Sequence, residues 1–311
     1  MGINGCVHDG TWSYGAGSRP TEMPARFARV AACRGASRTQ PENTRRAFDA
    51  ALRTGADELH ADVRITKDGV ALLCRDASLL RTTGKEALAK DLTAAEIQAL
   101  EADAHMPSDR ATPDRVPTLD DFVSRYLPKA ALLLELKEPG TVLPTVVTLQ
   151  SKAGDGSFEK VLAISAERSL LSSLRVLDSR VRLGQILERR STVTLADVKL
   201  FGAAVVLLFW EDAANKNNVD DAHRLGLTVY AWGAENFEEA KQAAAGGVDG
   251  ILYDNPPELV AYLKEAGLRD ESALAPVPNG APKTTSNGSG RQSTGEKAGD
   301  KAAEKSGTKS S

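Results

Sequence analysis

Short apolar segments alternate along the chain with longer segments whose apolar residues recur at helical spacing. Eight segments have this apolar character: residues 28–33, 57–63, 131–137, 161–165, 182–187, 203–209, 227–232 and 248–254. Short apolar strands connected through helices are typical of a parallel sheet that is buried on both faces. Eight of them in one α/β chain favour a closed (β/α)8 barrel, the TIM barrel, over an open sheet.

Polar signals between the apolar segments support this order of elements. Asn43 or Thr44 can cap the helix that follows the first strand, and Thr118 stands three residues before an acidic residue, which is capping-box spacing. The turn sequence Lys-Asp-Gly at 67–69 separates two extended segments, so the second strand is predicted to continue into a hairpin. A polar insertion over about 77–117 follows this hairpin.

The two ends of the chain differ in composition from the predicted barrel, which spans residues 28–267. Residues 1–27 are rich in glycine and lack apolar periodicity, so we expect a loose lead-in. Residues 268–311 hold almost no large apolar side chain. Such a segment cannot bury enough surface to offset the entropy lost on ordering, so a disordered tail is predicted. The sequence identifies no partner for this tail.

Charge and cysteine content exclude several classes of protein. The 39 basic and 42 acidic residues nearly balance, with a formal net charge of −3, which argues against a nucleic acid or an anionic membrane as partner. Cys6, Cys33 and Cys74 are odd in number and widely spaced, unlike a disulfide framework. Neither a signal peptide nor a transmembrane segment is recognised in the sequence, so we expect a cytoplasmic location.

Polar side chains gather at the carboxyl ends of the predicted strands, where (β/α)8 barrels build their sites. His60 and Asp62 are two residues apart on one strand and therefore face the same side, as do Glu135 and Lys137 on another. A histidine and two carboxylates that converge at a barrel mouth predict a divalent-metal site. Lys137 and Arg34 would suit an anionic, phosphate-like ligand.

Each of these residues also has a plain structural interpretation. His60 can be a hydrogen-bonded residue inside the barrel. Asp62 and Glu135 need a partner if they are buried, and that partner can be Lys137 instead of a metal. The sequence leaves this choice open. Cys33 can be a small buried apolar residue, as free cysteines usually are.

Seven motifs occur in order along the chain: RGAS…PENT..AF..AL..GAD, DV.ITKDGV, D..L.RTT, VPTLDDF, LLLELK, VYAW and GGVDGILYDNP. With these motifs, from about Arg29 to Gly267, the chain resembles the glycerophosphodiester phosphodiesterase (GDPD) family. The resemblance implies a metal-dependent (β/α)8 barrel of the phospholipase-C-like phosphodiesterase type. Members hydrolyse glycerophosphodiesters to an alcohol and glycerol 3-phosphate, which implies a place in glycerophospholipid metabolism.

Three reactive positions depart from the family's pattern. The family has histidines at the positions of Cys33 and Arg75, and these two histidines are its general acid and base. His60 replaces the glutamate of the family's Glu-x-Asp motif, while Asp62 and Glu135 match the other two acidic metal ligands. The resemblance therefore implies Mg²⁺ or Ca²⁺, whereas the imidazole of His60 favours a transition metal.

The polar positions around the phosphate are retained. Arg34, Glu42 and Lys137 match the family's substrate-binding residues. Trp232 matches a residue of the pocket wall, although the three residues that follow it differ from the family's Thr-Val-Asn. The resemblance thus implies a pocket for a small phosphodiester or another phosphate-containing ligand, with an altered wall.

The substitutions change the expected chemistry. Arginine stays protonated at any relevant pH, so Arg75 cannot act as a base and can only stabilise negative charge. Arg34 and Arg75 could lower the pKa of Cys33, so that its thiolate acts as a base or nucleophile. The motifs, however, position no neutral histidine to activate Cys33. A positioned acid or base contributes about 10²–10⁴ in rate, so the loss of both would leave little family activity.

Two functions follow from this pattern. In the first, a GDPD-like pseudoenzyme keeps a phosphate- and metal-binding pocket but has lost most or all ordinary hydrolysis of glycerophosphodiesters. In the second, a rewired metal-dependent enzyme acts on a phosphodiester or another substrate in the same pocket. It would use Asp62, Glu135 and Lys137, with Cys33 as a further reactive group. A purely structural or tail-mediated role is the third alternative.

Overall fold

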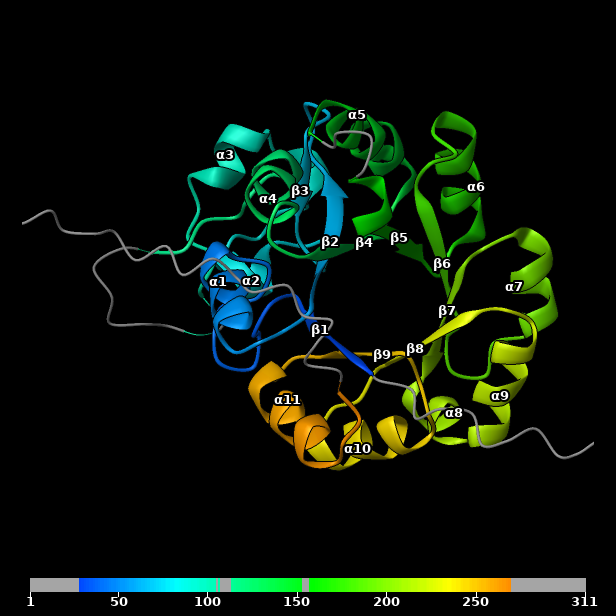
Figure 1. Cartoon of the computed structure of the whole chain (residues 1–311). Helices are drawn as coiled ribbons and strands as arrows, with labels where there is room; N and C mark the ends of the chain where they lie inside the picture. The colour runs from blue at the N-terminus through cyan, green and yellow to red at the C-terminus, as the bar shows by residue number, and fades with distance from the viewer. Residues whose placement is uncertain (1–27, 105, 107–112, 153–156, 270–311) are drawn as a thin grey trace, which may run out of the picture. The chain divides into compact units, whose positions relative to one another are not determined.

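The computed structural model describes residues 28–104, 106, 113–152 and 157–269, and these form a (β/α)8 barrel (Figure 1). The sheet order β1-β9-β8-β7-β6-β5-β4-β2 is closed by pairing between β1 and β2. The prediction of eight barrel strands is confirmed, with every boundary within two residues of the expected one. The parallel strands are β1 (Arg29–Cys33), β2 (Glu58–Ile65), β4 (Ala131–Leu136), β5 (Val161–Ser165), β6 (Arg182–Ile186), β7 (Val205–Phe209), β8 (Thr228–Trp232) and β9 (Gly250–Tyr253).

The predicted hairpin after the second strand is present. β2 continues into an antiparallel pair with β3 (Ala71–Leu73), in which Val63 lies opposite Leu73. The insertion that follows contains α2 (Leu80–Thr83), the 3-10 turn η1 (Ala89–Asp91) and α3 (Ala94–Gln98), packed around its own small apolar cluster. The hairpin brings residues 74–76 back to the carboxyl end of β2, where the amide of Cys74 donates to the carbonyl of Asp62 at 3.0 Å.

Helices surround the strands on the outside of the barrel (Figure 1). Thr44 caps the first helix through a bond from the amide of Ala47, and Thr118 caps α4 through a bond from the amide of Asp121. Both predicted caps are thus confirmed. The helices are α1 (Arg45–Arg53), α4 (Leu119–Tyr126), α5 (Val142–Lys152), α6 (Arg168–Leu177), α7 (Leu195–Phe201), α8 (Trp210–Ala214), α9 (Lys216–Arg224), α10 (Phe237–Ala245) and α11 (Pro256–Glu265), with 3-10 turns η2 (Pro139–Thr141) and η3 (Phe158–Lys160).

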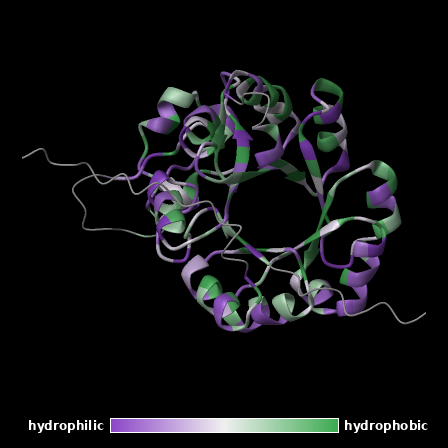
Figure 2. Ribbon diagram, viewed as in Figure 1, coloured by the Kyte–Doolittle hydropathy of each residue, from purple (hydrophilic) through white to green (hydrophobic). Residues whose placement is uncertain are grey.

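The strands bury apolar side chains on both faces, as their near-continuous apolar sequences require. Two clusters fill the space between strands and helices, each around one half of the barrel. A third cluster fills the barrel interior with alternate residues such as Leu133, Ile164 and Leu207. Figure 2 shows this contrast between hydrophobic strands and helices of mixed polarity. The interior below the strand ends is therefore a packed core, and polar chemistry is confined to the barrel's two ends.

The predicted lead-in over residues 1–27 and the predicted tail over residues 268–311, except Leu268 and Arg269, lie outside the described residues. Leu268 and Arg269 are described and contact the barrel: the Arg269 guanidinium donates to both carboxylate oxygens of Asp57, at 2.9 and 2.8 Å. None of the helices in the described part of the chain has the length and apolarity needed to span a lipid bilayer.

Candidate functional site

The turn after β1 places the first candidate residue at the mouth of the barrel. Cys33 ends the strand, and Arg34 and Gly35 both adopt left-handed conformations, with φ of 57° and 80°. Gly35 is required at this point, because a Cβ atom there would lie 2.5 Å from the backbone carbon of Ala47 in α1. The tight turn leaves Cys33 half-buried at the carboxyl end of the strand, with Arg34 beside it.

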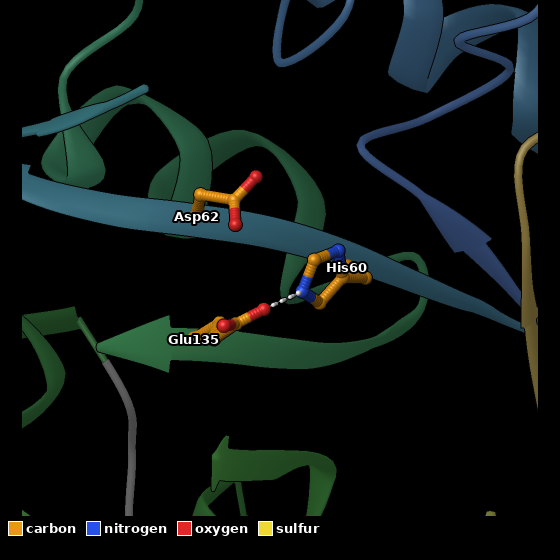
Figure 3. A group of neighbouring side chains, drawn as sticks. All are labelled: His60, Asp62 and Glu135. Atoms are coloured by element: carbon orange, nitrogen blue, oxygen red, sulfur yellow. Dashed lines mark hydrogen bonds and ion pairs between the residues drawn. The ribbon is translucent and has the colours of Figure 1, made fainter. Parts of the chain in front are cut away.

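The register of three neighbouring strands brings the other candidates together. Cys33 on β1 is the Cα partner of His60 on β2, and Asp62 on β2 is the partner of Glu135 on β4. Donor atoms of His60, Asp62 and Glu135 lie within 4.8 Å of one another. Figure 3 shows the His60 ring turned toward Glu135, with Asp62 farther along β2. The predicted convergence of a histidine and two carboxylates is therefore present.

All four carboxylate oxygens of this cluster already have protein partners. Lys137 donates to Asp62 Oδ1 at 2.9 Å and to Glu135 Oε1, and so bridges the two side chains. The other oxygen of Asp62 accepts from Asn43 Nδ2 at 3.1 Å. The other oxygen of Glu135 lies 3.2 Å from His60 Nε2. Lys137 is thus the shared partner of both carboxylates in this structure.

The charges within the cluster stabilise one another. Burial alone would raise the pKa of Asp62, but the cations Lys137, His60 and Arg34 outweigh burial and hold that pKa well below its usual range. The pKa of Glu135 is lowered in the same way, by its contacts with His60 and Lys137. Burial would lower the pKa of His60, yet its interactions with Cys33 and Glu135 raise it to about 10. These neighbours therefore favour the charged imidazole.

The divalent metal that the sequence implies would need His60, Asp62 and Glu135 as ligands. These three residues would hold the metal, and Lys137 contacts both carboxylates. A hard cation such as Mg²⁺ or Ca²⁺ also prefers oxygen ligands over an imidazole. As they are paired, His60, Asp62 and Glu135 do not fit Mg²⁺ or Ca²⁺, because binding would require displacement of the Lys137 ammonium.

The strand register places His60 beside Cys33, which the motifs did not show. The two residues are Cα partners on β1 and β2, and His60 is among the neighbours that lower the pKa of Cys33. His60 itself is buried, with only 2% of its surface exposed, and its Nδ1 has no hydrogen-bond partner among the described residues. That no neutral histidine is positioned to activate Cys33 therefore stays a prediction.

The two described cysteines differ in their protonation behaviour. Burial would raise the pKa of the Cys33 thiol, but the neighbouring Arg34 and His60 outweigh it and lower the pKa from its ordinary value. Burial raises the pKa of Cys74 to about 12, and its thiol donates to the carbonyl of Asp76 at 3.2 Å. Cys74 is thus a small buried residue, whereas Cys33 is partly buried and packs against the apolar cluster of the barrel interior.

Glu42 and Arg34 occupy the substrate-binding positions, but Glu42 is held mainly by a residue that sequence reasoning missed. Arg81 of α2 makes a bidentate ion pair with Glu42, at 2.7 and 2.8 Å, whereas Arg34 lies 3.5 Å from the same carboxylate. Arg34 Nε is buried and has no hydrogen-bond partner among the described residues. The guanidinium of Arg34 therefore keeps a free donor beside Cys33.

Asn43 is the second residue that sequence reasoning missed. It was considered only as a helix cap, but Thr44 takes that role. Asn43 has φ of 56°, and its amide group both donates to Asp62 Oδ2 and accepts from the Asp62 backbone N–H at 3.3 Å. Asparagine tolerates a left-handed conformation better than most residues, and this residue type was the signal that the sequence offered.

Arg75 and Trp232 lie at the margins of the site. The Arg75 side chain is half exposed, and its nearest ion-pair contact among the described residues is Asp76, at 4.0 Å. We had expected Arg75 to lower the pKa of Cys33, but Arg75 is not among the neighbours that do so. Trp232 donates to the carbonyl of Leu187 at 3.2 Å and packs edge-on against Phe209. Its place in the wall of a ligand pocket stays a prediction.

Comparison with known proteins places this site in a family. The fold and the site define a (β/α)8 barrel with polar residues at the carboxyl ends of β1, β2 and β4. The model of the glycerophosphoryl diester phosphodiesterase family matches residues 34–258. The chain belongs to this family.

Individual relatives agree along nearly their whole length. A glycerophosphodiester phosphodiesterase of Caldanaerobacter subterraneus subsp. tengcongensis is 28% identical over 241 residues, which cover 76% of this chain and 98% of that protein. The crystal structure of a glycerophosphodiester phosphodiesterase from Agrobacterium tumefaciens has a TM-score of 0.67 at 24% identity, covering 76% of this chain and 100% of the other. An Oleispira antarctica phosphodiesterase, solved in complex with its product sn-glycerol-3-phosphate, has a TM-score of 0.67 at 22% identity, covering 76% and 97%.

Proposed function

We propose that this protein binds a small phosphate-containing ligand at the carboxyl end of the barrel and has lost most of the ordinary hydrolysis of glycerophosphodiesters. Its ligand would come from glycerophospholipid metabolism, as the family's activity suggests. The observation that carries the proposal is that Arg34 and Lys137 remain at the barrel mouth, while Cys33 and Arg75 stand at the positions of the family's two proton-transfer histidines.

The cations at the mouth support a phosphate ligand. Arg34 has a buried donor without a protein partner, and Lys137 is one-fifth exposed toward the mouth. Guanidinium and ammonium groups are the usual partners of phosphate oxygens. The product complex of the Oleispira antarctica relative supports sn-glycerol 3-phosphate as the first ligand to test.

The reactive positions support the loss of hydrolysis. The family's two proton-transfer histidines are replaced by Cys33 and by Arg75, whose guanidinium cannot accept a proton. His60 is charged and engaged by Cys33 and Glu135, so it does not supply a free base. Each missing acid or base lowers the rate of hydrolysis by about 10²–10⁴, so we expect the rate to fall by several orders of magnitude in all.

The rewired enzyme is the second candidate function, and the contact between Cys33 and His60 favours it. A thiol beside a charged imidazole is a common arrangement for nucleophilic catalysis. This candidate shares the pocket and the ligand class with the first, and differs in the bond-breaking step. The cytoplasmic location predicted from the cysteine content stays a prediction.

Hydrolysis of a glycerophosphodiester panel with Mg²⁺, Mn²⁺ or Zn²⁺ tests the proposal. Wild type is compared with a Cys33→His, His60→Glu, Arg75→His variant, which restores the family's residues. We expect the variant to exceed wild type by at least about 10² in rate. The matched control adds Asp62→Ala to the variant and should be inactive. A wild type that hydrolyses the panel as fast as the variant would defeat the proposal.

A further inference from the structure

Glu42 at the barrel mouth is held by Arg81 of α2 more closely than by Arg34. The Arg81 guanidinium donates through Nη1 and Nη2 to the two carboxylate oxygens of Glu42, at 2.7 and 2.8 Å. Nη1 of Arg34 lies 3.5 Å from each of the same oxygens, which is longer than an ordinary hydrogen bond. Two parallel bonds between a guanidinium and a carboxylate are the strong geometry for this pair. Glu42 is therefore paired with Arg81, and Arg34 is only loosely engaged by it.

The insertion that follows β3 fixes the position of the Arg81 guanidinium. Leu79, directly before α2, is fully buried in the insertion's apolar cluster, and Gly84 ends α2 in a left-handed conformation. Asp76 accepts from Arg81 Nε at 2.6 Å, on the edge of the guanidinium that does not face Glu42 alone. Each of the three guanidinium nitrogens of Arg81 thus donates to a carboxylate. Arg81 is held in place by these bonds and is not itself available to a ligand.

Arg34 is the cation that this arrangement leaves available. Its Nε is buried without a hydrogen-bond partner in the described part of the chain, and 18% of its side chain is exposed. The Glu42 side chain is only 8% exposed, so its charge needs a partner. Without Arg81, Arg34 would be the cation beside that buried charge, already 3.5 Å away. Arg34 would then close on Glu42, and the carboxylate would compete with a phosphate for the guanidinium.

We infer that Arg81 is a positioning residue of the phosphate site, because it occupies Glu42 and thereby leaves the Arg34 guanidinium to the phosphate of the ligand. The inference rests on the proposed function, which supplies the phosphate ligand. Arg81 acts through Glu42 and does not touch the ligand, since all of its nitrogens have carboxylate partners. One ion pair thus couples the insertion after β3 to phosphate binding at the barrel mouth.

The experiment measures the Kd of sn-glycerol 3-phosphate by calorimetry on variants of the full chain, each checked for folding by urea denaturation. Arg81→Gln should weaken binding by about tenfold or more, as expected when the ligand loses a charge-assisted hydrogen bond from Arg34. Adding Glu42→Gln to Arg81→Gln should regain most of this loss, because a neutral amide no longer draws Arg34 away from the phosphate. A merely structural role for Arg81 predicts no such rescue.

Two further variants complete the design. Arg125→Gln is the matched control, because Arg125 of α4 is 44% exposed, close to the 39% of Arg81, and pairs with Asp49 at 2.9 Å. We expect its affinity for the ligand to equal that of wild type. Arg81→Lys keeps a positive charge beside Glu42 but lacks the planar fork that holds both oxygens, so its affinity should lie between wild type and Arg81→Gln. If Arg81→Gln does not fold, Arg81→Lys with and without Glu42→Gln makes the same comparison.

The outcomes separate this inference from the proposed function. If wild type binds the ligand and Arg81→Gln binds it equally well, the inference fails and the proposed function stands. The same holds if Arg81→Gln binds weakly and the added Glu42→Gln restores nothing. An equal loss in Arg125→Gln would assign the effect to stability and also overturn the inference. If wild type itself does not bind sn-glycerol 3-phosphate, the proposed function fails, and the inference fails with it.

Discussion

The two ends of the barrel each hold a buried carboxylate cluster in which β1 and β2 take part, and the two clusters differ in how completely their polar atoms are hydrogen-bonded. At the amino end, Glu58 of β2 accepts from Arg29 of β1 at 3.0 Å and from the Tyr230 hydroxyl at 2.9 Å. At the carboxyl end, His60 and Asp62 of β2 meet Cys33 of β1. The two clusters differ in whether buried nitrogen atoms lack a hydrogen-bond partner.

The amino end is closed. The Tyr230 ring packs over Gly250, where a Cβ atom would collide with it, and both oxygens of Glu58 are hydrogen-bonded to the Tyr230 hydroxyl. At the carboxyl end, buried His60 Nδ1 and Arg34 Nε have no hydrogen-bond partner in the described part of the chain. Buried polar atoms in native structures nearly always have partners, so we propose that a ligand supplies them at this end. In this proposal, the Glu58 cluster serves stability and the cluster around His60 serves the ligand.

The largest loss of stability should come from a substitution at the amino end of the barrel. Tyr230→Ala would remove a buried ring and the hydrogen bonds to Glu58, and leave a cavity. We expect the free energy of unfolding to fall by about 3–5 kcal/mol, measured by urea denaturation. Binding of sn-glycerol 3-phosphate to the folded fraction should not change. A loss below about 1 kcal/mol would contradict a structural role for this cluster.

A substitution of Lys137 at the carboxyl end should lower stability less than Tyr230→Ala and should allow a divalent metal to bind. Lys137→Gln removes the ammonium that bridges Asp62 and Glu135 and should cost about 1–3 kcal/mol, because two carboxylates lose a charged partner. The two carboxylates then become accessible to a divalent ion. Mn²⁺ or Zn²⁺ should raise the melting temperature of the variant and leave wild type unchanged. Equal stabilisation of both proteins would show that Lys137 does not exclude the metal.

The protonation of His60 predicts a pH dependence with a definite sign. Its pKa is raised to about 10 in the folded protein from an ordinary value of 6.5. Stability contributed by the charged imidazole is therefore complete below pH 6.5 and is lost as pH rises toward about 10. The difference in unfolding free energy between wild type and His60→Gln should shrink over this range. A difference that stays constant or grows with pH would show that His60 is not charged at neutral pH.

Much of the fold was predictable because it depends on local patterns. Apolar segments of strand length marked the barrel strands, and the Lys-Asp-Gly turn marked the hairpin after β2. Thr44 and Thr118 marked two helix starts by short-range hydrogen bonds. Residues at the carboxyl ends of strands were recognised as site residues because a parallel barrel places those ends together.

The contacts that decide the chemistry were not predictable in the same way. The pairing of Cys33 with His60 depends on the register between two parallel strands, which no turn fixes. The ion pair between Glu42 and Arg81 joins residues 39 positions apart through the insertion. Arg75 was placed correctly along the chain, but the direction of its half-exposed side chain depends on packing that sequence does not record.

The most direct test is a calorimetric titration of sn-glycerol 3-phosphate into wild type, Lys137→Gln and Arg29→Gln. The two variants each remove one cation, at the carboxyl and the amino end of the barrel. We predict binding to wild type and to Arg29→Gln with equal affinity, and binding at least about tenfold weaker in Lys137→Gln, as the loss of a charge-assisted hydrogen bond requires. Absence of binding to wild type, or equal affinity in Lys137→Gln, would contradict a phosphate site at the carboxyl end.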